Sequence, residues 1–276
     1  PLLASVYPNG KADVNEFQEA GGPAFVIREL IGAGCMYPDA VTVSHGGLID
    51  YTKKPVLKNN AIYWSDLPEQ SGDETVVRKA DNPFSETGGL KLLKGNIGRS
   101  VIKISAVPLE KHIIEAPALI FNSQEELLIA FDEGKLDQDF IAVVRFQGPK
   151  ANGMPELHKL TPPLSVIQSK GYKVAIVTDG RMSGASGKIP AAIHMSPEGA
   201  AGGDIAKIKA GDLIRVDATN GTLDVLIDSK VWKERKIEEM TDAQKSQNSQ
   251  GIGRDLFSSM RKNVLSAEEG AITWVG

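Results

Sequence analysis

The feature that most constrains the fold is an apolar run that changes abruptly into a glycine-rich polar loop. Residues 174–177 are all apolar and include two valines and one isoleucine, a composition typical of a buried β-strand. The loop that follows, residues 178–188, carries three glycines together with hydroxyl, carboxylate and cationic side chains. Open α/β sheets place their ligands at the carboxyl ends of such strands. The sequence therefore predicts that this loop binds or transforms a small anionic molecule.

The amino-acid composition argues against several classes of protein for this chain. The net charge of −4 disfavours a nucleic-acid partner. No apolar run approaches the ~18 residues of a membrane span, so we expect no membrane partner. Cys35 is the only cysteine; this excludes an internal disulfide, fits a reducing compartment, and leaves too few thiolates for an iron–sulfur cluster held by this chain alone. We therefore expect a cytoplasmic protein, and the start at Pro1 within an apolar run indicates a fragment.

Turn and capping signals divide the chain into elements. A polar stretch with one short strand, residues 61–64, lies between a helical beginning and a strand-rich remainder. Expected strands are 90–93, 101–107, 113–121, 140–146, 174–177, 213–217 and 222–227, the last two joined by Asn220-Gly221. Expected helices are about 14–20, 23–31, 124–133, 156–170, 230–236 and 255–265. The pattern predicts a strand-rich α/β fold, with peripheral helices around a barrel or sandwich-like core.

A second loop has the same design as the first. Gly148–Glu156 follows the strand 140–146, and Glu156 is expected at a helix start. There its carboxylate either complements the helix dipole or serves as a ligand for a hard metal such as Mg²⁺. Two strand-to-loop sites in one domain are predicted to face one pocket.

The first loop leaves three interpretations. A Walker phosphate loop is disfavoured, because its first glycine would fall on Met182 and its Ser/Thr on Ile189. A solvated turn needs only the capping ability of the serines. A catalytic loop needs one serine as base or nucleophile, with Arg181 or Lys188 lowering its pKa or holding an anion.

Three motifs together carry a resemblance to a known family. They are Thr178–Pro190 (TDGRMSGASGKIP), Gly148–Lys159 (GPKANGMPELHK) and Gly95–Arg99 (GNIGR). The chain resembles the C-terminal part of the dihydroxy-acid dehydratase/6-phosphogluconate dehydratase family. The variants SGASGK and MPELHK, with the run Tyr7–Gln18 (YPNGKADVNEFQ), resemble its phosphogluconate branch.

The resemblance implies an activity and a set of site residues. The whole enzyme of that branch is a hydro-lyase that removes water from 6-phospho-D-gluconate in the Entner–Doudoroff pathway, with an iron–sulfur cluster, expected to be 4Fe-4S, as Lewis acid. The C2 proton goes to a serine alkoxide, which maps to Ser183, with Ser186 as second choice. Glu156 maps to a Mg²⁺ ligand. Our substrate-binding candidates are Lys188, Arg181 and Asp179; Lys188 is preferred for the phosphate, because a cation beside glycine amides forms an anion nest.

The resemblance also implies a domain organisation. Residues 1–55 are expected to end an N-terminal, cluster-binding domain, and residues 56–276 to form a swivel-like β/β/α domain around a β-barrel. The fragment alone is expected to be inactive, the cluster cysteines lying outside it, and the enzyme to be a homodimer. The alternatives are a sibling dehydratase for a sugar acid or dihydroxy acid, and a non-catalytic binding module.

Overall fold

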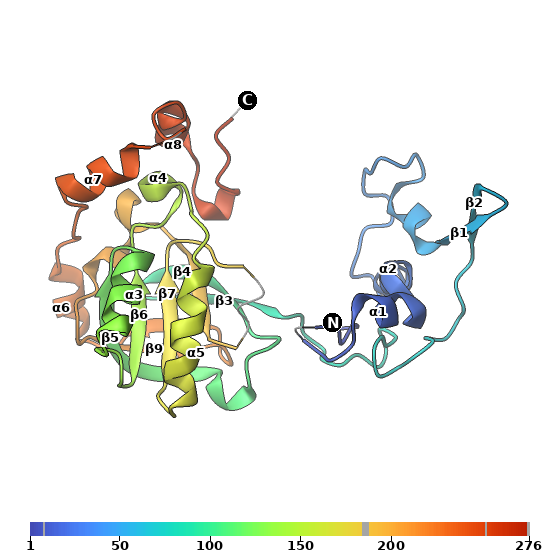
Figure 1. Ribbon diagram of the computed structural model, residues 1–276, viewed down its shortest axis with the longest axis horizontal. Coiled ribbons are helices and arrows are strands. Elements are labelled where there is room, and N and C mark those ends of the chain that lie inside the picture. The colour runs from blue at the N-terminus through green and yellow to red at the C-terminus, as the bar shows by residue number, and fades with distance from the viewer. Residues whose placement is uncertain (8, 184–187, 252, 275–276) are drawn as a thin grey trace. The chain divides into compact units, whose positions relative to one another are not determined.

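The computed structural model describes residues 1–276 except 8, 184–187, 252 and 275–276 (Figure 1). The chain forms two compact units, Pro1–Gly89 and Leu90–Gly276. This division falls later than the domain boundary expected at residue 55. The reason is that residues beyond 70 return to the first unit, where Val77 pairs with Ala4 and Ser85 with Leu2 in isolated bridges.

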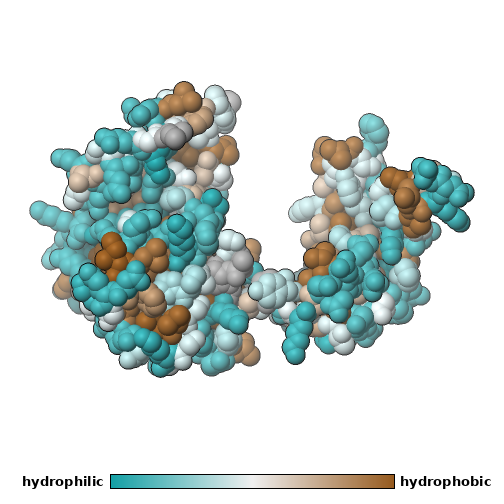
Figure 2. Space-filling view, viewed as in Figure 1, coloured by the Kyte–Doolittle hydropathy of each residue, from teal (hydrophilic) through white to brown (hydrophobic). Residues whose placement is uncertain are grey.

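The first unit contains two helices and a hairpin: α1 (Val14–Ala20), α2 (Gly22–Gly32), β1 (Lys54–Lys58) and β2 (Ala61–Ser65). The predicted capping box at the start of α1 is confirmed, since Asp13 accepts from the Glu16 N–H and Glu16 accepts from the Asp13 N–H. Phe25 is fully buried in the small core of this unit. The β1–β2 hairpin exposes apolar side chains, which form a brown patch in Figure 2.

The second unit is built on a closed barrel of eight strands in the order β10-β3-β4-β8-β7-β6-β5-β9. The strands are β3 (Leu90–Gly95), β4 (Gly98–Lys103), β5 (Ile113–Phe121), β6 (Phe140–Val144), β7 (Val174–Thr178), β8 (Ala191–Ser196), β9 (Leu213–Asp217) and β10 (Thr222–Val225). The strand-rich α/β fold with a barrel core is therefore confirmed. The strand β8 is one that the sequence analysis did not predict.

Four neighbouring strands of the barrel, β5, β6, β7 and β8, run parallel. Alternate residues of β6 and β7 explain why these strands are apolar throughout. Ile141 and Val143, with Ala175 and Val177, fill the barrel interior. The residues between them face outward into a second core. Because both faces are covered, polar groups are confined to the strand ends.

Helices accompany the barrel on its outer face and at one end. They are α3 (Gln124–Asp132), α4 (Pro149–Asn152), α5 (Thr161–Ser169), α6 (Ser229–Glu234), α7 (Asp242–Ser249) and α8 (Ser258–Asn263). Of these, α3 and α5 pack on the outer face of the barrel, whereas α4, α7 and α8 lie at one end of it (Figure 1). Leu127 of α3 and Leu164 of α5 are fully buried in the outer core. The expected helix from residue 156 begins only at Thr161, where prolines occupy the first turn, a position that needs no N–H donor. No helix in the described part of the chain combines the length and the apolar character needed to cross a bilayer.

Candidate active site at the ends of β6 and β7

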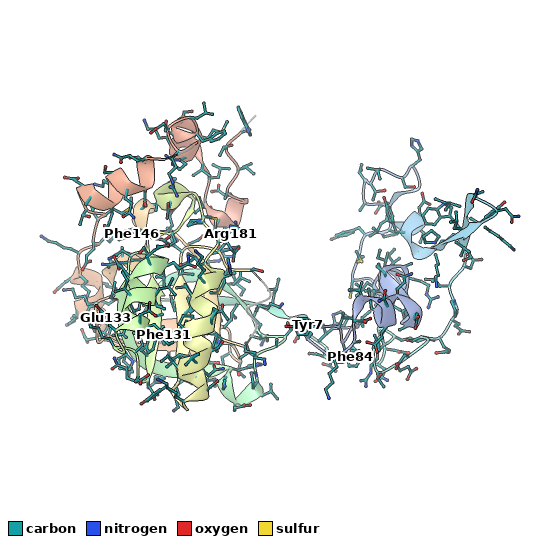
Figure 3. All side chains as sticks on the ribbon, in the orientation of Figure 1. Tyr7, Phe84, Phe131, Glu133, Phe146 and Arg181 are labelled. Carbon is teal, nitrogen blue, oxygen red and sulfur yellow. The ribbon has the colours of Figure 1, made fainter. Side chains whose placement is uncertain are left out.

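The two predicted loops meet at one end of the barrel. Since β6 and β7 are parallel and Val144 pairs with Thr178, the loops leave the sheet side by side. Glu156 and Arg181 then form an isolated parallel bridge, in which the Leu157 N–H donates to the Arg181 carbonyl at 3.2 Å. Arg181, labelled in Figure 3, lies at this end of the barrel. The two loops therefore meet, whereas the pocket that they are expected to share stays a prediction.

Glu156 joins the two loops through both carboxylate oxygens. Its Oε2 accepts from Arg181 Nη1 at 3.0 Å, and its Oε1 accepts from the backbone N–H of Ser183 at 2.6 Å. Arg181 is also held by its Nε, which donates to the Met154 carbonyl at 2.7 Å. The expectation that Glu156 begins a helix is wrong; it lies in extended chain that pairs with the second loop. The cluster Glu156–Arg181–Ser183 thus holds the Arg181 guanidinium and the Ser183 backbone on one carboxylate.

Asp179 lies beneath this cluster and is fully buried. Its Oδ1 accepts from the Gln147 N–H at 2.8 Å, and its Oδ2 from the N–H groups of Phe146 and Gly199 at 3.1 and 2.9 Å. Burial raises the pKa of Asp179 to about 6, against the opposing effect of these donors. Asp179 is buried in this chain, and its role in substrate binding stays a prediction. Its carboxylate positions the loop ends.

Close packing around Asp179 explains the glycine of the loop. A Cβ on Gly180 would lie 2.8 Å from both the Gln147 Cβ and the Leu157 Cδ1. The first loop therefore sits directly on the second, and a larger residue would separate them.

Glu198 is a second buried carboxylate that the sequence analysis missed. It accepts from the N–H groups of Lys150 and Ala151 at 2.9 and 3.1 Å and so caps α4. Burial raises its pKa, and its negative charge contributes to the raised pKa of Asp179. It could have been found only by recognising β8, the strand that it follows.

His194 is a further neighbour of the cluster that the sequence analysis did not single out. The backbone N–H of His194 donates to the Gly180 carbonyl at 2.9 Å. Its pKa is lowered, first by burial and then by the positive charge of Arg181. The neutral imidazole is thus favoured beside Arg181.

The remaining candidates are less closely placed. Lys188 is exposed, and its recorded contact is a backbone one, in which Gln168 Nε2 donates to its carbonyl at 3.4 Å. Ser186 lies outside the described residues. The structure therefore joins Glu156, Arg181 and Ser183 by recorded contacts, with Asp179 beneath them.

The residues present do not hold a metal cofactor by themselves. The chain's single cysteine, Cys35, is exposed and belongs to the first unit. In the described residues there is no group of three or more His, Cys, Asp or Glu side chains that could hold an ion. Glu156 offers one carboxylate, already paired with Arg181. A cluster or a Mg²⁺ ion would need ligands from elsewhere.

The sequence that forms this barrel and its loop cluster matches one protein family along most of its length. Residues 75–271 match the model for the dihydroxy-acid/6-phosphogluconate dehydratase C-terminal region, and residues 1–51 match the N-terminal one. The chain belongs to this dehydratase family.

Relatives within the family differ in similarity. The chain is 53% identical over 274 residues to a phosphogluconate dehydratase of Pseudomonas aeruginosa, covering 99% of this chain and 44% of the relative. It is 54% identical over 271 residues to the phosphogluconate dehydratase of Rhizobium meliloti, covering 98% and 44%. Identity falls to 36% over 278 residues, covering 99% and 45%, for a dihydroxy-acid dehydratase of Francisella tularensis. The chain thus spans less than half the length of these relatives.

Proposed function

We propose that this chain is the C-terminal part of a 6-phosphogluconate dehydratase. That enzyme removes water from 6-phospho-D-gluconate and gives 2-keto-3-deoxy-6-phosphogluconate. The higher identity to relatives named phosphogluconate dehydratase than to the dihydroxy-acid dehydratase supports this substrate. The observation that carries the proposal is the Glu156–Arg181–Ser183 cluster at the ends of β6 and β7.

Ser183 is the proposed base. The C2–H bond breaks, and its proton passes to the Ser183 alkoxide, which becomes the hydroxyl. The electron pair of that bond forms the C2=C3 bond as the C3 hydroxyl takes a proton from solvent and leaves as water. The resulting enol then tautomerises to the ketone. A serine oxygen is a poor base unless positive charge stabilises its anion. Our proposal takes Arg181 as one source of that charge, because Arg181 and the Ser183 backbone N–H bind the same Glu156 carboxylate. Glu156 holds both residues in place, and Asp179 holds the strand ends below them.

The other parts of the enzyme are proposed from family membership. The iron–sulfur cluster and the remaining Mg²⁺ ligands belong to residues outside this chain, so the chain alone should be inactive. Residues 1–55 are proposed to complete the cluster-binding domain. The enzyme is proposed to work as a homodimer in the cytoplasm.

The test uses the full-length protein, reconstituted with iron and sulfide without oxygen. The wild type should convert 6-phosphogluconate to the 2-keto acid, followed by a carbonyl reagent. Ser183→Ala should lower kcat by about 10²–10⁴-fold with little change in KM, the range for loss of a general base. Ser229→Ala, an exposed serine of α6, is the matched control and should be unaffected. Full activity of Ser183→Ala would exclude Ser183 as the base, and no dehydration by cluster-loaded wild type would refute the function.

A further inference from the structure

The C-terminal segment packs beside the candidate site and forms a groove with the second loop. Helices α7 and α8 both contact α4, and a cavity of about 480 Å³ is lined by residues of the second loop and of the segment 253–273. The residues that matter for the argument are Gly153, Met154, Arg254 and Arg261, all of which line it. Since the Met154 carbonyl accepts from Arg181 Nε at 2.7 Å, the groove is directly next to the Glu156–Arg181–Ser183 cluster.

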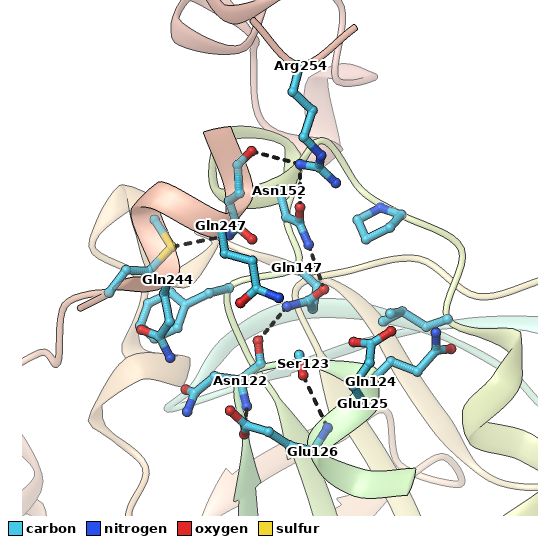
Figure 4. A pocket seen from close by; sticks show the side chains of 15 residues that line it. Asn122, Ser123, Gln124, Glu125, Glu126, Gln147, Asn152, Gln244, Gln247 and Arg254 are labelled. Carbon is cyan, nitrogen blue, oxygen red and sulfur yellow. Dashed lines mark hydrogen bonds between the residues drawn. The ribbon is translucent and has the colours of Figure 1, made fainter. Parts of the chain in front are cut away.

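Arg254 is fixed in this groove by a chain of side-chain amides. Gln147 Nε2 donates to the Asn122 carbonyl at 2.7 Å, and Asn152 Nδ2 donates to Gln147 Oε1 at 3.0 Å. Arg254 Nη1 completes the chain, donating at 2.8 Å to Asn152 Oδ1 and, also at 2.8 Å, to the Asn248 carbonyl. Figure 4 shows this run of amides leading up to Arg254. The same Gln147 donates its backbone N–H to Asp179, so the position of Arg254 is coupled to the frame of the site.

These bonds occupy Nη1 only. Within the part of the chain that the structure describes, Nε and Nη2 of Arg254 have no recorded partner. Arg254 is half-buried, and an immobilised guanidinium with donors left over is suited to a bidentate oxyanion.

Arg261 extends from α8 into the same groove, where a Cβ on Gly153 would lie 3.8 Å from its Cδ. Arg261 and Arg254 differ from the other arginines of the second unit in their ion pairing. Among the described residues of that unit, five arginines form ion pairs with a carboxylate and these two do not; the five are Arg99, Arg145, Arg181, Arg215 and Arg235. Two arginines without a carboxylate at one groove leave uncompensated positive charge for a ligand to neutralise.

We propose that Arg254 and Arg261 bind a phosphate monoester. On the proposed function, on which this identity of the ligand rests, it is the 6-phosphate of the substrate. The phosphate and C2 are at opposite ends of the sugar acid, so the phosphate belongs in a groove beside Ser183 rather than in the Ser183 loop. The phosphate-binding role is therefore assigned to Arg254 and Arg261 instead of Lys188. Arg181 keeps its ion pair with Glu156 and its proposed role in stabilising the base.

The first test needs no dehydratase activity. Inorganic phosphate is titrated into this chain while the arginine Nε–H signals are followed by NMR. The signals of Arg254 and Arg261 should move together. Arg254→Gln and Arg261→Gln should each weaken phosphate binding by about tenfold to hundredfold, the effect of losing a charged hydrogen bond. Lys262→Gln removes the same charge from an exposed neighbour and should change binding less than about twofold. Unmoved arginine signals, or unchanged binding by both arginine variants, would overturn the proposal.

The second test uses the reconstituted full-length enzyme. Both arginine variants should raise KM for 6-phosphogluconate about tenfold or more, with kcat much less affected, and Lys262→Gln should behave as wild type. Arg261 makes no recorded side-chain hydrogen bond among the described residues, so its variant should fold normally. Unchanged KM in an active enzyme would overturn the phosphate site while the proposed function stands. Arginine-dependent phosphate binding in an enzyme that does not dehydrate 6-phosphogluconate would refute the function and leave the anion site.

Discussion

Asp179 offers the most direct test of how the site is held together. Its carboxylate is fully buried, yet it accepts three backbone N–H bonds. Asp179→Asn keeps the shape of the side chain but removes the charge and one acceptor. In its better orientation the amide oxygen accepts from the N–H groups of Phe146 and Gly199. The amide NH₂ then faces the Gln147 N–H, which loses its acceptor. The loss of an acceptor costs about 1–3 kcal/mol, and the loss of a buried charge offsets part of it.

The dependence of this cost on pH separates the effect of the carboxylate's titration from the other effects of the substitution. The pKa of Asp179 is raised from 3.8 to about 6 on folding. Between these values the folded protein holds a proton that the unfolded chain has released. The stability contributed by this group is therefore greatest at low pH and is lost as the pH rises towards 6. The two pKa values give a loss on the order of 1 kcal/mol between about pH 5 and about pH 7.

Asp179→Asn lacks this titration, so the variant should be more destabilised, relative to wild type, at about pH 5 than at about pH 7, by on the order of 1 kcal/mol. Urea unfolding followed through Trp232, buried in the barrel core, measures the difference. With a slope of about 2 kcal/mol per molar urea it corresponds to about half a molar in the midpoint difference. Asp228→Asn is the matched control, because Asn replaces Asp at the N-cap of α6 at little cost. A cost of Asp179→Asn that stays constant or grows with pH would refute the reasoning, since the N–H donors would then outweigh burial.

Three further changes test local packing and the cluster. Gly180→Ala should destabilise the barrel by about 1–3 kcal/mol through its clash with Gln147 and Leu157, measured as a fall in Tm; Gly32→Ala, which meets nothing within 4 Å, should not destabilise the protein. Gly221→Ala should cost about 1–2 kcal/mol, because its φ of +72° is left-handed, and an unchanged Tm would contradict that backbone. Glu156→Gln should change stability by less than about 1 kcal/mol, since its ion pair with Arg181 is partly exposed, yet lower kcat of the full-length enzyme; unchanged kcat would remove its positioning role.

Local signals were sufficient to predict most of the fold. The Asn220-Gly221 turn predicted the β9–β10 hairpin, and the apolar run at 174–177 predicted a strand covered on both faces. Strand β8 was missed because it begins directly after the site loop with alanines and includes His194, so tertiary pairing rather than β-propensity defines it. Helix α7 was missed too, although Thr241 and Gln244 form a capping box at its start.

The candidate site was only partly predictable. The matching design of the two loops correctly indicated that they meet, because parallel neighbours end at the same edge. The burial of Asp179 could not be predicted, since its three donors come from two other segments of the chain. Likewise Arg254 lies just before the helix expected at about 255–265, and its place depends on Asn152, which is distant in the chain, and on Asn248.

The way the barrel closes has a consequence for how it opens. Strands β6 and β7 share five paired positions, whereas β10 and β3 meet at one, Thr222 with Lys94. Transient opening should therefore begin at this seam, and the Lys94 amide, which donates to the Gly221 carbonyl, should exchange with deuterium early among the barrel amides. A barrel parted there becomes an open sheet with two unpaired edges, and such edges pair readily with other chains. A tighter turn or an added contact between β10 and β3 should therefore reduce aggregation more than the same change elsewhere in the barrel.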